Sequence, residues 1–406
     1  MEQIKEKNMK IDPRGIGLVF LLGSLTALDP LSIDMYLPAF GQIQTDFATS
    51  INKVELSVST FFIGMAFGQL IYGPLADRFG RKKPLLAGML VYLMATIACA
   101  LAPTIEWFIG FRLLQALGGC AGMVITRAII RDLFDKRESA IFLSQMALIM
   151  GIAPIVAPSI GAFISAHFGW KAIFWTLALA NIACFFTVSI FLPETNTHQK
   201  SEMKIFSTIK SYGSLLKNPE FVGYLLPDTL VRAGMFAYIA GSPFVFINLL
   251  GISESRYGLI FGMNGLGLML AAQLNRRLLS KFTPNQILKW AVNMACLAGI
   301  IVFVTAWMNL GAVVILSSLF VFLMSLNFIS PNALVGALAS QGHQAGTASA
   351  LYGCLQWVLA SVAAFFVGHF HNGTAVPMTG TILSCGLLSF IAFRVLVKKR
   401  DKAALA

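Results

Sequence analysis

Residues 73–82 read Gly-Pro-Leu-Ala-Asp-Arg-Phe-Gly-Arg-Lys, a short charged stretch between two apolar runs. The flanking runs cover about 53–76 and 84–102. Each is long enough to cross a bilayer as a helix, which takes about 20 apolar residues. Glycine at positions 73 and 80 permits a tight turn and close approach of the helices. The stretch therefore predicts two membrane-spanning helices joined by a short basic turn.

The same alternation of apolar runs and short polar turns continues along the whole chain of 406 residues. The composition is 57% hydrophobic and only 12% charged, whereas soluble proteins carry about 25% charged residues. We therefore predict an all-α polytopic membrane protein with twelve transmembrane helices. Their expected ranges are 16–40, 53–76, 84–102, 106–130, 139–166, 170–192, 220–249, 256–279, 286–307, 310–338, 343–369 and 375–397.

The basic residues are placed unevenly between the two sides of these predicted helices. Most of the 30 Lys and Arg flank alternate turns, and the opposite turns hold only Lys53, Lys171 and Arg256. The positive-inside rule then predicts a multi-pass protein of the bacterial inner (cytoplasmic) membrane with both termini cytoplasmic. The net charge of +12 does not indicate nucleic-acid binding, because no basic patch with interleaved aromatic residues is present.

One long polar stretch divides the predicted helices into two groups of six. We expect a six-helix bundle over 1–192, a cytoplasmic linker over 193–218 and a second six-helix bundle over 219–406. Residues 271–276 of the second half (Ala-Ala-Gln-Leu-Asn-Arg) faintly repeat residues 73–78 of the first half. Two similar halves with a site at their interface are a common plan of transporters.

Two opposite charges lie at matching depth in different predicted helices. Asp34 and Arg112 are each about six residues, or about 9 Å, from the outer helix end. A lone charge in the membrane costs about 2.5 kcal/mol or more, so an ion pair between them is feasible. Moving Asp34 between wet and sealed surroundings would switch its proton affinity. The alternative is a static ion pair that only fixes helix packing.

Asp29, Asp228 and Arg232 also lie inside predicted helices. Asp29 is five residues before Asp34, roughly 140° around an ideal helix, and bending at Pro30 and Pro38 would change that angle. It is a candidate second proton site, a contact for a cationic substrate, or a polar group facing a water-filled cavity. Asp228 and Arg232 are four residues apart on one helix face, so they either neutralise each other locally or contact a polar substrate.

Other candidates come from the helix ends and from aromatic residues. Arg131 and Asp132, at the inner end of the fourth predicted helix, would close a charge network with Asp77 and Arg81; independent solvation is the alternative. The fifth predicted helix has residues that bend a helix or let it pack closely, namely Gly151, Pro154, Pro158 and Gly161. The candidate aromatic residues for a substrate cavity are Tyr36, Phe236, Tyr238 and Trp357.

The turn pattern, with Gly73, Asp77, Arg78, Gly80 and Arg81, resembles the signature of the major facilitator superfamily. Further segments resemble one of its subfamilies, the bicyclomycin- and chloramphenicol-resistance (Bcr/CflA-like) drug:proton antiporters. They are SIDMYLPAF (32–40), GQLIYGPLADRFGRK (68–82), FRLLQALGG (111–119), RDLF (131–134), APIVAPSIGAF (153–163), AGMFAYIAGSPFVFI (233–247) and AGTASALYG (345–353). The likeness covers nearly the whole chain.

This resemblance implies a secondary active transporter, not an enzyme, that exports drugs by alternating access in exchange for protons. Bicyclomycin-, chloramphenicol- and sulfonamide-like substrates are expected, with no cofactor or metal and with a monomer as the working unit. The resemblance makes Asp34 the proton-linked acid, Arg112 its basic partner, the basic turn a gating motif and the fifth helix the antiporter motif. The alternative function is export of an amino acid or another small metabolite, with drug transport incidental.

Overall fold

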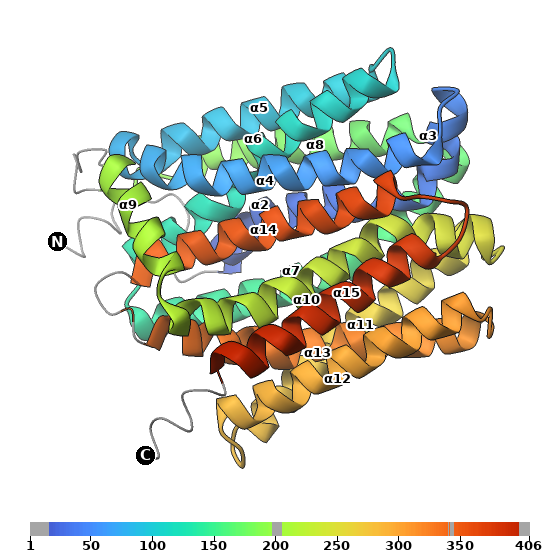
Figure 1. The fold of residues 1–406 in the computed structure, drawn as a ribbon. Coiled ribbons are helices and arrows are strands. Elements are labelled where there is room, and N and C mark those ends of the chain that lie inside the picture. Colours follow the sequence, from blue (N-terminus) through green and yellow to red (C-terminus); the bar gives the residue numbers. More distant parts are fainter. Residues whose placement is uncertain (1–15, 197–204, 340, 342–344, 398–406) are drawn as a thin grey trace, which may run out of the picture. The chain divides into compact units, whose positions relative to one another are not determined.

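A computed structural model describes residues 16–196, 205–339, 341 and 345–397 of the chain. Within these ranges the structure consists of helices and short connections (Figure 1). Twelve of the helices are long and apolar enough to cross a membrane. The prediction of an all-α polytopic protein with twelve transmembrane helices is therefore confirmed.

The chain divides into two compact units, Met1–Met203 and Lys204–Ala406. The first contains α2 (Ile16–Asp34), η1 (Leu37–Ala39), α3 (Phe40–Asp46), α4 (Ile51–Phe79), α5 (Lys82–Ala100), α6 (Ile105–Leu133), α7 (Lys136–Phe168) and α8 (Lys171–Phe191). The second contains α9 (Ile205–Leu216), α10 (Pro219–Pro243), η2 (Phe244–Leu249), α11 (Glu254–Leu278), α12 (Pro284–Trp307), α13 (Ala312–Ala339), α14 (Ala345–His369), α15 (Val376–Ala392) and η4 (Phe393–Val397).

The first predicted helix, 16–40, is interrupted near the second of its two prolines. Helix α2 contains Pro30 and ends at Asp34, a turn with Pro38 follows, and α3 then continues to Asp46. Proline has no N–H to donate, so the helix hydrogen-bond ladder cannot run unbroken through this turn. The break places Asp34 at a helix end and turns Tyr36 into the protein interior, where it is fully buried.

The segment predicted as a linker contains a packed helix. Helix α9 contributes Leu215 to a buried cluster with Phe221 and Leu225 of α10 and with Leu351 and Tyr352 of α14. Residues 197–204 of the predicted linker lie outside the described residues. The boundary between the two units falls within the predicted range of 193–218, but the second part of that range belongs to the hydrophobic core of the second unit.

Helices of the first unit approach each other closely through glycine. A Cβ atom at Gly118 of α6 would overlap the backbone of Tyr92 in α5, and one at Gly64 of α4 would lie 2.8 Å from Cβ of Ala116. Small residues at such crossings let membrane helices pack backbone to backbone. This packing seals the polar side chains of α5 and α6 inside the unit.

Candidate functional sites

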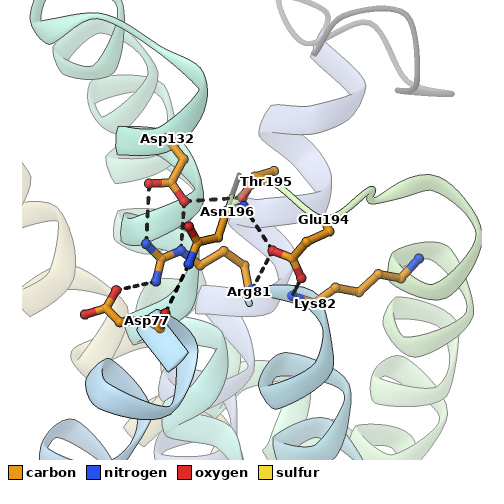
Figure 2. A network of polar contacts seen from close by, with 7 residues as sticks. All are labelled: Asp77, Arg81, Lys82, Asp132, Glu194, Thr195 and Asn196. Carbon is orange, nitrogen blue, oxygen red and sulfur yellow. Dashed lines mark hydrogen bonds and ion pairs between the residues drawn. The ribbon is translucent and has the colours of Figure 1, made fainter. Parts of the chain in front are cut away.

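The basic turn between α4 and α5 is built around one buried arginine. Arg81 is only 5% exposed, and its Nη1 donates to Oδ1 of Asp77 at 2.5 Å. Its Nε donates to Oδ2 of Asp132, at the end of α6, at 2.7 Å (Figure 2). Burial alone would lower the pKa of Arg81, but the hydrogen bonds and charges of Asp132 and Asp77 together raise it. Arg81 is thus a permanent cation that joins the ends of two helices.

A segment after α8 completes this arrangement. Oε1 of Glu194 accepts a hydrogen bond from the backbone N–H of Arg81 at 2.7 Å, and Oε2 accepts one from Lys82 at 3.1 Å. The Glu194 carboxylate therefore caps the N-terminus of α5, where unpaired N–H groups and the helix dipole favour an anion. Gly80 makes this possible, because its φ of 88° suits glycine and a Cβ there would overlap the Glu194 carboxylate.

Two neighbours of Glu194 make further contacts with the same helices. Thr195 donates to Oδ2 of Asp132 at 3.4 Å, and Nδ2 of Asn196 donates to the carbonyl of Asp77 at 3.2 Å (Figure 2). We call the seven residues the Arg81 cluster: Asp77, Arg81, Lys82, Asp132, Glu194, Thr195 and Asn196. It joins the ends of α4, α5, α6 and α8.

Not every residue of the predicted gating motif belongs to the Arg81 cluster. The prediction of a network among Asp77, Arg81 and Asp132 is correct. Arg78 instead lies over the ring of Phe79, 5.1 Å from its centroid, and Arg131 is exposed. Neither makes an ion pair with the described residues of the cluster. Arg131 faces another side of α6, because it is one residue, or about 100°, before Asp132 on the helix.

Arg112 lies in an aromatic cage inside the first unit. It is fully buried, and its guanidinium carbon lies 4.3 Å from the ring centroids of both Tyr36 and Phe61. Phe174 of α8 adds a third ring at 5.9 Å. Nη1 donates to Oε1 of Gln115 at 2.6 Å, whereas Nε and Nη2 have no hydrogen-bond partner among the described residues.

The expected ion pair between Asp34 and Arg112 is not formed in this structure. Helix α2 ends at Asp34, and the following turn places the ring of Tyr36, not the carboxylate, over the guanidinium. Asp34 is 3% exposed, and its Oδ1 has no hydrogen-bond partner among the described residues. Matching depth was therefore insufficient, because it ignores which way the broken helix turns its side chains. Cation–π contacts stabilise Arg112 instead, each worth about 2 kcal/mol when desolvated.

The predicted antiporter motif packs against the backbone that follows Asp34. A Cβ atom at Gly161 of α7 would overlap the carbonyl oxygen of Met35, so only glycine permits this approach. Pro154 and Pro158 lie inside α7, which continues as one helix through both, and Gly151 lies one turn before them. The motif thus contacts the proposed proton-linked acid through the neighbouring peptide group.

Asp29 is fully buried in helix packing, and both of its carboxylate oxygens lack a hydrogen-bond partner within the described residues. It lies against Gly119 of α6, where a Cβ would overlap Oδ1. The alternative in which Asp29 faces a water-filled cavity does not fit this conformation. From sequence alone, Pro30 and Pro38 left the direction of the Asp29 side chain open.

In the second unit, Asp228 is the centre of a complete hydrogen-bond network. It is fully buried and accepts hydrogen bonds from Oη of Tyr352 at 2.9 Å and Nε2 of Gln356 at 2.8 Å. Ser330 also donates to it. Arg232 donates to Oγ of Ser330 at 2.6 Å and lies 3.5 Å from Asp228. The predicted local pair exists, but its main connections run to α13 and α14.

The four aromatic candidates for a substrate cavity do not form one group. Phe236 and Trp357 contact each other, with ring centroids 5.1 Å apart. Tyr238 stacks on Phe261 at 5.5 Å and accepts a hydrogen bond from Asn264 at 3.0 Å. Tyr36 belongs to the cage around Arg112. Phe236 lies on α10 and Trp357 on α14, so this pair joins two transmembrane helices of the second unit. Trp357 directly follows Gln356, which donates to Asp228.

In the part of the chain that the structure describes, no group of three or more His, Cys, Asp or Glu side chains is arranged to hold a metal ion. The six cysteines are not joined in disulfides. The buried polar groups of the described residues are carboxylates, the guanidinium groups of Arg81 and Arg112, and hydroxyl or amide side chains. This chemistry is suited to binding protons and small polar molecules.

Comparison with known proteins identifies the family. The model of the Major Facilitator Superfamily matches residues 22–365, so the chain belongs to this superfamily, whose members are transporters rather than enzymes. It is 30% identical to a bicyclomycin resistance protein homolog of Haemophilus influenzae, over 95% of this chain and 97% of that protein. It is also 30% identical to a chloramphenicol resistance protein of Pseudomonas aeruginosa, over 89% and 86% of the two chains.

A further relative is an uncharacterized MFS-type transporter, YdgK, of Bacillus subtilis. It is 34% identical over 95% of this chain and 96% of its own length. Among solved structures, a peptide transporter in complex with sulfate aligns with a TM-score of 0.77 at 12% identity, covering 99% of this chain and 98% of that chain. A bacterial homolog of the human lysosomal transporter Spinster aligns with a TM-score of 0.75 at 15% identity, covering 96% and 98%. These likenesses show the fold.

Proposed function

We propose that this transporter exports drugs in exchange for protons and that Asp34 carries the coupled proton. The observation that supports this most is that Asp34 is buried and forms no ion pair within the described residues, while Arg112 of the same unit is buried in its aromatic cage. Bicyclomycin- and chloramphenicol-resistance proteins among the relatives favour drugs of those classes as substrates. Sulfonamide-like compounds are the third class that we propose.

The coupling follows from the cost of an isolated buried charge. With its Oδ1 sealed from donors, the Asp34 carboxylate is disfavoured, so the neutral acid is the stable form in this conformation. Opening of the turn that holds Met35 and Tyr36 would hydrate the acid and release its proton. Because Gly161 packs on the same turn, a movement of α7 is transmitted to Asp34 through the backbone.

The Arg81 cluster is the proposed gate on the cytoplasmic side. Its contacts tie the ends of α4, α5, α6 and α8 together (Figure 2). Alternating access requires such ties to break and re-form as the transporter changes conformation. The basic turns favour a cytoplasmic location for this end, in an inner membrane and with both termini inside. We propose that a monomer is sufficient for transport.

A second candidate function is export of an amino acid or another small metabolite. It is favoured by the acid–base pair Asp228 and Arg232, because Nε of Arg232 is buried without a hydrogen-bond partner. A guanidinium with a free donor suits a substrate carboxylate. A competition panel of drugs and amino acids against efflux separates the two: drugs compete under the first proposal, and amino acids alone compete under the second.

A drug-sensitivity profile tests the drug-export proposal. An exporter-deficient bacterial host expresses the wild type, Asp34→Asn or Glu106→Gln, the last as a control because Glu106 forms only an exposed ion pair with Lys53. We expect the wild type and the control to raise resistance to chloramphenicol or bicyclomycin, and Asp34→Asn to lose it at equal expression. Resistance from Asp34→Asn equal to that of the wild type would contradict the proposal.

A further inference from the structure

We propose that Asp29 is a proton-binding site separate from Asp34, occupied by a proton in this conformation. The site is the contact between α2, α5 and α6, and its ligand is a single proton on the carboxyl group. Its participation in transport rests on the function proposed above, whereas its occupancy by a proton does not. The test below therefore measures the two separately.

The geometry around Asp29 leaves the carboxyl without any donor. The residue is fully buried, and neither Oδ1 nor Oδ2 has a hydrogen-bond partner within the described ranges. Oδ1 occupies the space that a side chain at Gly119 would need. The ring of Tyr92 closes the same place, since its Cδ2 lies 3.2 Å from a Cβ built at Gly119. Gly119 of α6 leaves space for the Asp29 carboxyl, but no N–H or O–H group of the described part of α6 donates to it.

The charged and titratable groups nearby do not compensate a carboxylate. Arg127 lies about two turns beyond Gly119 on α6 and is exposed. The hydroxyl of Tyr92 is engaged with Oγ of Ser32 at 2.6 Å. Arg112 lies two turns from Gly119 and is held by Gln115 and its aromatic cage. Cys120 points toward Met65 of α4. The other helices that pack on α2 are α7 and α8, whose charged and histidine residues all lie in their first or last turns: Lys136, Arg137, Glu138, His167 and Lys171.

Asp228 shows how this protein surrounds a buried aspartate with hydrogen-bond donors. Both acids are fully buried, but Asp228 accepts hydrogen bonds from Tyr352, Gln356 and Ser330. An uncompensated carboxylate in such a medium is costly enough that the group binds a proton instead. The chain thus contains two fully buried aspartates with different surroundings. Asp228 accepts several hydrogen bonds, whereas Asp29 accepts none from the described residues. The bound proton is therefore placed on Asp29.

Hydration is what would release this proton. A movement of α2 away from Gly119 would expose the Asp29 carboxyl to water or to the hydroxyl groups of Tyr92 and Ser32, which lies three residues further along α2. Either would stabilise the carboxylate. Because Asp29 and Asp34 share α2, a movement of this helix at Pro30 changes the surroundings of both acids.

Infrared difference spectroscopy on the purified full-length protein in liposomes tests the occupancy, with no drug present. We expect a carbonyl band of a neutral buried carboxylic acid at neutral pH that is lost in Asp29→Asn and kept in Asp34→Asn as a separate component. The band should diminish when the medium is made alkaline. Asparagine resembles the neutral acid in shape, so Asp29→Asn should melt close to the wild type.

Two results would overturn the proposal. One is an infrared spectrum that is unchanged by Asp29→Asn; the other is a band that persists at every pH at which the protein stays folded, which would make Asp29 a static buried acid. If Asp29→Asn does not fold, Gly119→Ala takes its place, because it keeps the acid but crowds Oδ1. The Gly119→Ala substitution must then shift the carbonyl band of the Asp29 carboxylic acid. A band at the wild-type position overturns the proposal.

A second arm measures participation in transport. Proton release on adding chloramphenicol to the detergent-solubilised protein is compared between the wild type, Asp29→Asn and Asp34→Asn. We expect each variant to release fewer protons than the wild type. If no protein releases protons while the infrared band behaves as expected, the proposed antiport fails and the proton site at Asp29 stands. If Asp29→Asn releases as many protons as the wild type, the proton on Asp29 takes no part in transport.

Discussion

At the scale of single residues, the most unusual group is a buried guanidinium that is stabilised by rings. Arg112 contacts Tyr36 and Phe61 through their faces and donates one hydrogen bond to Gln115. Gln115 in turn donates to Thr96 at 2.9 Å. These contacts hold Arg112 by aromatic rings and amide or hydroxyl groups, without an ion pair to Asp34.

Arg112→Lys should therefore behave as a disruptive change. Lysine keeps the charge but loses the planar stacking on two rings. We therefore expect the free energy of unfolding to fall by about 2 kcal/mol, with a lower melting temperature and weaker drug export. Tyr36→Phe is the matched control. It keeps the ring and removes only the 3.0 Å hydrogen bond to Ser57, worth about 1 kcal/mol. If Arg112→Lys melts and exports drug like the wild type while Tyr36→Phe does not, the aromatic rings do not stabilise Arg112 as proposed.

The second unit offers a contrasting residue-scale prediction. Asp228→Asn replaces one acceptor oxygen by an NH2 donor that faces the donors of α13 and α14 and should lower the stability by about 3 kcal/mol. Tyr352→Phe removes one donor and should cost about 1 kcal/mol. Melting curves of the purified variants measure both. Equal melting temperatures of Asp228→Asn and the wild type would show that the network contributes no stability.

At the scale of elements, close packing between α7 and the end of α2 depends on one glycine. Gly161→Ala should destabilise the protein by about 1–3 kcal/mol because the new Cβ overlaps the carbonyl of Met35. Gly110→Ala in α6 is the control, since a Cβ there meets open space and alanine favours a helix. Thermal melting in detergent compares the two variants. A Gly161→Ala protein that melts above the wild type would contradict the predicted overlap.

The connection between α8 and α5 gives another prediction at this scale. Glu194→Ala leaves the backbone N–H groups of Arg81 and Lys82 without their acceptor, and should cost about 1–2 kcal/mol. Glu194→Gln keeps an acceptor oxygen and should cost less. Proteolysis at the turn between α4 and α5 reports opening directly. Faster cleavage of the alanine variant is expected, and cleavage as slow as in the wild type would show that the cap is dispensable.

Local sequence patterns predicted the parts of these sites that lie close together in the chain. Asp77 and Arg81 are four residues apart, and Asp132 lies at the next helix end on the same side, so their network could be foreseen. Glu194 could not be linked to Arg81, because no periodicity connects residues that far apart. The same limit applies to Ser330, Tyr352 and Gln356 around Asp228. Proline at 30 and 38 signalled a bend but not its direction.

At the scale of the whole molecule, hydropathy and charge were sufficient for the fold, because each membrane span needs its own long apolar run. They could not show that α9 packs into the core of the second unit. This helix has only 12 residues, and its sequence lies within a long polar stretch that is typical of a linker. The two units also differ in their buried acids. Among the described residues, the first holds Asp29 and Asp34 with carboxylate oxygens that have no hydrogen-bond partner, and the second holds Asp228, which accepts several hydrogen bonds. This difference is the reason that we propose proton coupling in the first unit.

Proton movement in inside-out membrane vesicles tests this central claim most directly. A preformed proton gradient is followed with a fluorescent dye while chloramphenicol or bicyclomycin is added. For the wild type and Glu106→Gln, the account predicts that the drug partly collapses the gradient; for Asp34→Asn, it predicts no response at equal protein level. A gradient that collapses equally in Asp34→Asn vesicles would contradict the account, because a proton would then be exchanged for drug without the acid assigned to carry it.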